Sequence, residues 1–165
     1  MERQYWTVVF TGRTWDEFIK AGGKSMGFRE HRTDVVQRMR PGDRLLCYVS
    51  KVSRWIGILE VAGGLGRDKT RIFSDESFPL RVPVKVIEQL TRSNSIPVRE
   101  LLPRFSWWNE SLSPAQWGAR LQTTPTQMNP VDGSMVELAI REAVSHPVSR
   151  PVVEKRWQTR PRTGV

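Results

Sequence analysis

A chain of 165 residues is long enough to form one domain that buries a hydrophobic core without disulfide or metal cross-links. Its 26 Lys and Arg outnumber 17 Asp and Glu, and the resulting net charge of +9 favours a polyanionic partner, nucleic acid above all. The single cysteine, Cys47, excludes a disulfide within the chain. Because no apolar leader or run of transmembrane length is present, we expect a cytoplasmic protein with no membrane partner.

The N-terminal part of the chain predicts a strand and two short helices. Residues 5–10 are β-branched or aromatic, which is typical of a strand. Residues 14–17 have the form of a capping box, so we expect a helix to begin there and to end at the glycine pair 22–23. A polar, basic loop is predicted over residues 24–32, and a short helix follows over residues 34–39.

A hairpin over residues 40–61 is the strongest local pattern. It opens with Pro41-Gly42-Asp43, which is turn chemistry, and residues 45–49 and 55–61 are apolar runs of strand length. Between them lies a short polar reversal, and Trp55 follows directly after it. A large aromatic side chain beside hydroxyls and cations is suited to a planar ligand, so we expect a nucleobase at this position.

The middle of the chain alternates between loops, strands and helices. A Gly-rich loop covers residues 62–70 and lacks the spacing of a phosphate-binding motif. Residues 79–87 alternate as a strand does, but Pro83 within them predicts an edge strand or a bulge. Residues 96–102 predict a strand that turns into a helix, and Ser113-Pro114 is a typical helix start.

The C-terminal part predicts one further helix and then a tail. Residues 123–133 indicate a loop, and a helix capped by Asp132 or Ser134 extends to Val144. Residues 147–165 are basic and contain three of the prolines, which predicts a tail or linker after a domain spanning residues 1–146. Because the strands lack βαβ spacing, we expect an α+β fold: a mixed β-barrel of about five or six strands flanked by short helices.

The chain offers little that supports catalysis. It has no nucleophile elbow, no zinc-binding HExxH and no Cys-x-x-Cys, and one cysteine and two histidines do not make a recognisable triad. We therefore expect a protein that is not an enzyme and that uses no metal and no cofactor, with a small enzyme of unknown class as a lesser alternative. What remains is positive charge with seven Trp, the combination that nucleic-acid readers use to hold phosphates and to stack on unpaired bases.

Several segments resemble an EVE domain, a member of the PUA-like superfamily that is similar to YTH domains. The most specific is the ordered block of Pro41-Gly42-Asp43 followed by Ser53-Arg54-Trp55-Ile56-Gly57. The resemblance extends over about residues 5–144, and its further segments are Tyr5-Trp6, Gly27-Phe28-Arg29, residues 78–85 and Ser106-Trp107.

The resemblance implies a PUA-like barrel and a non-enzymatic reader of modified bases. The expected ligand is 5-methylcytosine or a derivative in DNA, flipped into an aromatic pocket. The alternative is a modified RNA, because YTH relatives read N6-methyladenine. Bacterial members are often fused to nuclease or translocase modules in modification-dependent restriction, so such a module is an expected partner.

The site residues follow from the positions that the resemblance matches. It places a base pocket at Trp55, Ser53, Phe28, Trp107 and Phe73, with Thr11 and Gly12 at the base edge and Met26 beside Phe28. Phe28 stands where YTH domains have a cage tryptophan, a departure from the strict methyladenine cage. Charge and proximity to these segments predict phosphate contacts at Lys51, Arg54, Arg29 and Lys24.

Overall fold

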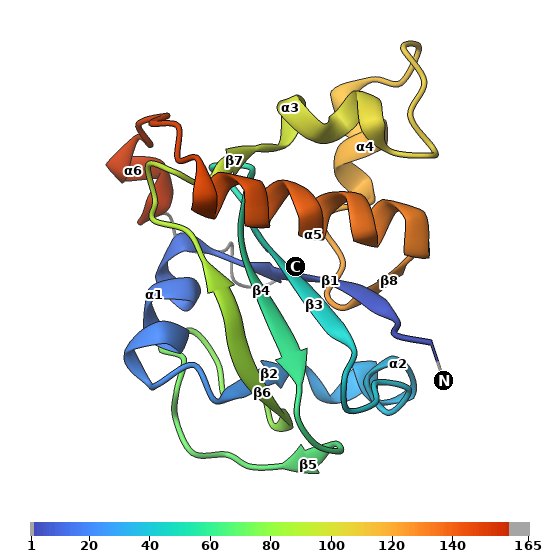
Figure 1. Ribbon diagram of the computed structural model, residues 1–165. Helices are drawn as coiled ribbons and strands as arrows, with labels where there is room; N and C mark the ends of the chain where they lie inside the picture. The colour runs from blue at the N-terminus through green and yellow to red at the C-terminus, as the bar shows by residue number, and fades with distance from the viewer. Residues whose placement is uncertain (1, 159–165) are drawn as a thin grey trace.

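A computed structural model describes residues 2–158 and shows one mixed sheet that curls into a half-barrel (Figure 1). Six strands follow one another across it in the order β2-β6-β4-β3-β1-β8, and β5 and β7 pair at the sides with β6 and β4. Only β1 and β3 pair in parallel among these described strands; the other ladders are antiparallel. The strand bounds are β1 Tyr5–Phe10, β2 Ser25–Phe28, β3 Arg44–Val49, β4 Arg54–Val61, β5 Gly66–Arg67, β6 Leu80–Gln89, β7 Ile96–Pro97 and β8 Thr126–Met128.

Short helices surround the sheet, and one longer helix crosses it. Helix α5 packs over β1, β3, β4 and β6, as Figure 1 shows in orange. Strand β3 is therefore covered on both faces, and each of its six residues is buried. The helix bounds are α1 Gly12–Lys20, α2 Thr33–Val36, α3 Val98–Leu101, α4 Pro114–Ala119, α5 Pro130–Ser145 and α6 Glu154–Trp157, with 3₁₀ turns at Glu30–Arg32 and Leu102–Arg104.

The four long strands β1, β3, β4 and β6 are those that the sequence predicts, and the expected α+β class is confirmed. Pro83, however, does not lie on an edge, because β6 runs between β2 and β4, and the irregularity in the β4–β6 register falls at residues 86–88 and not at Pro83. The proline pairs with Ser25, the first residue of β2, so its missing N–H falls at the end of that ladder.

The short elements depart from expectation. Strands β2 and β8 form in segments that were expected to be loops. Each is an edge strand of only three or four residues with little alternation, which gives no strand signal in the sequence. Helix α1 begins three residues earlier than expected: Thr11 is its N-cap and Thr14 completes the capping box. Helix α5 is capped by Asn129 instead of Asp132 or Ser134.

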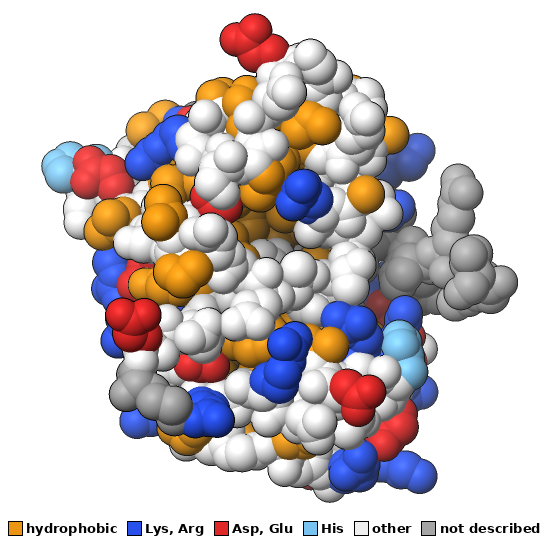
Figure 2. Space-filling model, turned by 90° about the vertical axis from the view of Figure 1, so that its right-hand side faces the viewer, with side chains coloured by type: hydrophobic (Ala, Val, Ile, Leu, Met, Phe, Trp, Pro, Cys, Tyr) orange, Lys and Arg blue, Asp and Glu red, His pale blue; other side chains and the backbone are white. Residues whose placement is uncertain are grey.

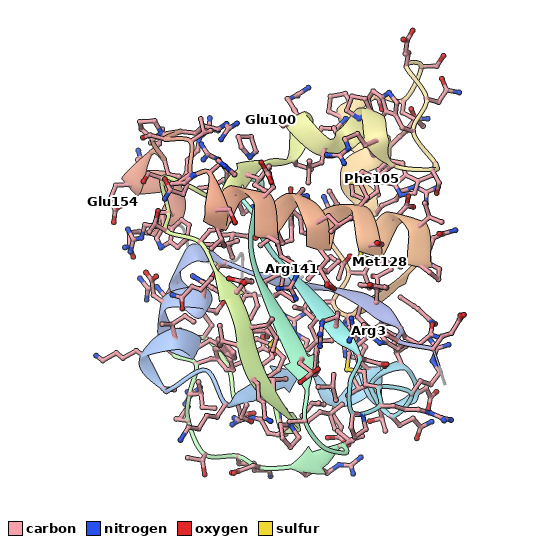
Figure 3. All side chains as sticks on the ribbon, in the orientation of Figure 1. Arg3, Glu100, Phe105, Met128, Arg141 and Glu154 are labelled. Carbon is pink, nitrogen blue, oxygen red and sulfur yellow. The ribbon has the colours of Figure 1, made fainter. Side chains whose placement is uncertain are left out.

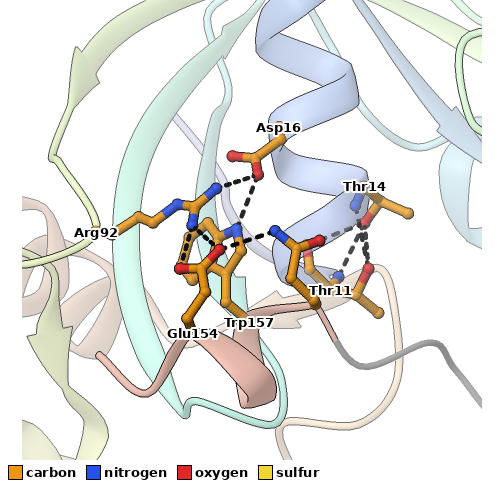
Figure 4. A network of polar contacts seen from close by, with 7 residues as sticks. Thr11, Thr14, Asp16, Arg92, Glu154 and Trp157 are labelled. Atoms are coloured by element: carbon orange, nitrogen blue, oxygen red, sulfur yellow. Dashed lines mark hydrogen bonds and ion pairs between the residues drawn. The ribbon is translucent and has the colours of Figure 1, made fainter.

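The segment expected to be a tail is packed against the barrel as far as the structure describes it. Trp157 in α6 is fully buried, and its Nε1 donates a hydrogen bond of 2.9 Å to Asp16 in α1 (Figure 4). The Arg92 guanidinium lies 4.6 Å from the centre of the Trp157 ring and also pairs with Asp16 and Glu154. Gly12 leaves room for this ring, since a Cβ there would lie 2.6 Å from it. Residues 159–165, with Arg160 and Arg162, lie outside the described residues.

Candidate functional site

A cavity of about 400 Å³ lies between the C-terminal end of β1 and the edge strand β2. Within residues 2–158 these two strands form no ladder with each other, so the half-barrel stays open at this place. The walls come mainly from four segments that are distant in sequence, residues 9–14, residues 26–32, residues 73–78 and residues 122–124, and Ser50 after β3 joins them. The concave site is thus formed by the gap between two unpaired strands and not by a void in the hydrophobic core.

Aromatic rings form much of the cavity wall. Phe28 of β2 and Phe73 are almost fully buried, and Phe78 is partly exposed. Phe73 and Phe78 meet edge to face, with ring centres 5.2 Å apart. Gly27 permits this approach, because a Cβ there would lie 2.8 Å from the Cβ of Phe78 and 3.0 Å from the ring of Phe73. Phe78 has a φ of 43°, a conformation that non-glycine residues seldom adopt and that its surroundings must stabilise.

Arg81 holds the loop that carries these rings. Its side chain is buried, with 6% of the residue exposed, and it donates hydrogen bonds to the carbonyl oxygens of Thr70, Ser77 and Phe78 at 2.7 to 2.8 Å. Burial lowers the pKa of Arg81 from its ordinary value. The guanidinium thus holds three backbone carbonyls of this loop through hydrogen bonds, and it keeps Phe78 at the cavity.

Polar groups complete the rim. Arg29 pairs through two hydrogen bonds of 2.9 Å with Glu76, and this contact raises the pKa of Arg29. Arg32 donates to the carbonyl of Pro125 at 2.7 Å. On the β1 side, the Val9 N–H donates to the hydroxyl of Thr124 at 3.2 Å. Residues 122–124, which precede β8, therefore form the part of the cavity wall next to the end of β1.

The surroundings of the cavity are basic. A neighbouring groove shares Arg32 with it and adds Arg38 and Arg120, from α2's C-terminal side and the end of α4. Figure 2 looks onto the side that carries β8 and α2, and it shows a hollow with hydrophobic side chains on its floor and several Lys and Arg side chains, together with Asp and Glu, on the surrounding surface. No group of three or more His, Cys, Asp or Glu side chains within residues 2–158 is placed to hold a metal ion. No helix of that part is long and apolar enough to cross a membrane.

A family model described as the EVE domain matches residues 4–132, which is most of the chain. The chain belongs to the EVE domain family. The match includes the four wall segments of the cavity, so this EVE domain carries the site within the part that its family shares.

Relatives and solved structures agree with this assignment. A UPF0310 protein of Pyrococcus abyssi (strain GE5 / Orsay) is 26% identical over 117 residues, which are 64% of this chain and 72% of the relative. The Mmi1 YTH domain solved in complex with RNA aligns over 90% of this chain and 84% of its own, with a TM-score of 0.63 and 13% identity. A hypothetical protein from Leishmania major aligns over 87% of this chain and 98% of its own, with a TM-score of 0.61 and 17% identity. These likenesses confirm the expected YTH-like, PUA-like fold of this EVE domain.

Five of the predicted site residues meet at the cavity of this EVE domain. They come from the end of β1, from β2 and from the loop before β6, and they are Thr11, Met26, Phe28, Arg29 and Phe73. Gly12 is adjacent, but its free side faces Trp157. Lys24 precedes β2 and is exposed, without lining the cavity.

Trp55 lies elsewhere, and the expectation that it stacks on a base does not agree with its position. The side chain has no exposed surface and packs between Tyr48, 5.1 Å away, and Phe105, 6.3 Å away (ring centres). Figure 3 shows Phe105 on the side of α4 and α5. Residue 55 is the second residue of β4, and residues 55–59 of this strand are all buried, so the side chain is enclosed whichever face of the sheet it occupies.

The remaining predicted residues also lie outside the cavity. Trp107 lines a separate groove with Arg120, whose guanidinium lies 4.7 Å from its ring. Ser53 and Lys51 lie in the β3–β4 turn and line an adjoining groove. Arg54 does not face a phosphate site, because its guanidinium donates to the carbonyls of Ser95, Arg150 and Pro151.

Several lining residues carry no signal in the sequence. Phe78 looks like an ordinary loop aromatic, and Asp75 and Glu76 look like solvated carboxylates. Ser50 reaches the cavity because β3 pairs in parallel with β1, which brings the two strand ends together. That pairing alone would have pointed to Ser50.

Proposed function

We propose that this EVE domain is a non-enzymatic reader of a modified base in nucleic acid, which leaves its stack and enters the cavity between β1 and β2. The observation that carries the proposal is an aromatic-walled cavity of about 400 Å³ at a basic surface. Extruding a base costs a few kcal/mol, and stacking on aromatic side chains returns about 1–3 kcal/mol. Phosphate contacts supply the sequence-independent remainder, for which the net charge of +9 is suited.

We assign the ligand to 5-methylcytosine or a derivative in DNA, in keeping with the resemblance to EVE domains. The grooves beside the cavity take the flanking backbone, and Lys51, Arg38 and Arg120 are the phosphate contacts in them. The protein then acts in the cytoplasm in modification-dependent restriction, next to a nuclease or translocase module that cuts or moves the marked DNA.

A modified RNA such as one with N6-methyladenine is the second candidate. It is supported by the Mmi1 YTH domain, which has a similar fold and was solved with RNA. Phe28 of β2 stands where YTH domains have a cage tryptophan, and this departure from the methyladenine cage supports the first candidate over the second.

The test is a binding series at one salt concentration. Duplexes that differ at one position, with cytosine, 5-methylcytosine or 5-hydroxymethylcytosine, are compared with RNAs that carry adenine or N6-methyladenine. We expect 5-methylcytosine or its derivative to bind at least tenfold more tightly than cytosine. Equal affinity for all five nucleic acids refutes a modified-base reader, and a preference for methylated RNA selects the second candidate.

The variant Phe78→Leu tests whether the base binds in this cavity. The change keeps an apolar side chain and removes the ring of the partly exposed wall, so affinity should fall by about 1–3 kcal/mol. Trp107→Leu is the matched control, because Trp107 lines a different groove. A loss in the control with none at Phe78 would move the base to that groove.

A further inference from the structure

Asp75 is a carboxylate of the cavity wall with an unmet hydrogen-bonding capacity. Its Oδ2 has no exposed surface and accepts no hydrogen bond from any described residue. The neighbouring carboxylate, Glu76, differs because Arg29 binds both of its oxygens. Of the two acidic side chains that line the cavity, Asp75 is therefore the one whose carboxylate forms no hydrogen bond within the described residues.

The backbone on both sides of Asp75 is anchored. The N–H of Ser74 donates to Glu17 of α1 at 3.0 Å, and the carbonyl of Ser77 accepts from Arg81 at 2.8 Å. A carboxylate held at a fixed place acts as a specific acceptor, since little ordering is needed when the ligand arrives. A buried acceptor left without a donor is unfavourable, so a ligand that brings an N–H is preferred over one that does not.

We propose that Asp75 makes the cavity selective for a base that presents an exocyclic amino group. The inference rests on the proposed function and names what the site reads beyond the methyl group. 5-Methylcytosine and thymine share the ring and the methyl group, so aromatic walls alone do not separate them. They differ at C4, an amino group in cytosine and a carbonyl in thymine, and at N3, an acceptor in cytosine and an N–H in thymine. A carboxylate that faces C4 accepts from the amino group and is repelled by the carbonyl.

The same acceptor serves the second candidate ligand. N6-methyladenine keeps one N–H on its exocyclic nitrogen, so the reading of an amino group does not depend on which nucleic acid enters. Arg32 adds an unpaired donor at the same cavity, because its Nε has no partner among residues 2–158. An acceptor and a donor in one cavity fit a base edge that carries an amino group beside a ring nitrogen or carbonyl.

The test uses single-stranded oligonucleotides that are identical except for one position, which carries 5-methylcytosine, cytosine or thymine. Single strands remove the difference in base-pair opening between these bases. Wild type should bind 5-methylcytosine at least tenfold more tightly than thymine. In Asp75→Asn the amide donates to the thymine carbonyl, so this ratio should fall at least tenfold. Asp34→Asn, the same change at an exposed aspartate of α2 that does not line the cavity, should leave the ratio unchanged.

The outcomes separate the two proposals. If wild type binds 5-methylcytosine no better than cytosine, the proposed reading of 5-methylcytosine fails. If it prefers 5-methylcytosine to cytosine but binds thymine equally well, the reader stands and the role of Asp75 is overturned. An unchanged ratio in Asp75→Asn, with the thermal midpoint of wild type, also overturns that role.

Discussion

Trp157→Ala tests whether residues 147–158 belong to the folded domain. The side chain is fully buried, and replacing a buried Trp by Ala typically costs about 3–5 kcal/mol. The lost hydrogen bond adds little, because Asp16 keeps its ion pair with Arg92 at 2.7 Å and its side chain is 42% exposed. A domain of this size loses about 2–4 °C in Tm per kcal/mol, so Tm should fall by about 6–20 °C.

The assay is urea and thermal unfolding followed by circular dichroism. Val153→Ala is the control from the same segment; its side chain is 61% exposed, so the free energy of unfolding should stay within about 0.5 kcal/mol of wild type. A Trp157→Ala variant within 1 kcal/mol of wild type would show that the segment does not contribute to the core. The packing of α6 on α1 in Figure 4 would then be refuted.

Two further predictions concern the cavity wall and the acid stability of the sheet. Gly27→Ala places a Cβ 2.8 Å from Phe78, so it should lower stability by about 1–3 kcal/mol and weaken base binding, whereas Gly64→Ala, with open space around it, should change neither in the same unfolding and binding assays. The hydrogen bond from Arg44 lowers the pKa of Glu60, so its stabilisation is present at neutral pH and is lost as pH falls through the folded-state pKa. Glu60→Gln should therefore be less stable than wild type at pH 7, and the difference should narrow as the pH is lowered through that folded-state pKa; a difference that does not change with pH would contradict this account.

The barrel was predictable because its central strands carry their signal locally. The runs around Leu45–Val49 and Trp55–Val61 are apolar, of strand length and bounded by a turn, and they become β3 and β4. The edge strands were not predictable, because β2 and β8 are stabilised by partners distant in the sequence. Trp157 was missed for the same reason: prolines and arginines surround it, and its partners lie on α1 and after β6.

The site was predictable only in part. Phe28, Phe73 and Thr11 line one cavity, and the sequence pointed to them only through the resemblance to EVE domains, since no local pattern links the three residues. Trp55 was misplaced because the hairpin pattern in the sequence does not reveal that both faces of β4 are covered at this point. A bulge between Cys47 and Tyr48 shifts the register of β3 and β4 at this point, and no residue pattern announces it.

Because the cavity lies in the gap between β1 and β2, the parts of the chain that stabilise the fold differ from those that shape the cavity. The ladders of β1, β3, β4 and β6 under α5 hold the domain together, while the loop of residues 73–78 and the segment of residues 122–124 shape what enters. Substitutions at the exposed positions of those two segments, such as Ser74, Gln122 and Thr123, leave both the core and the central ladders untouched, so the opening of the cavity can change at little cost in folding.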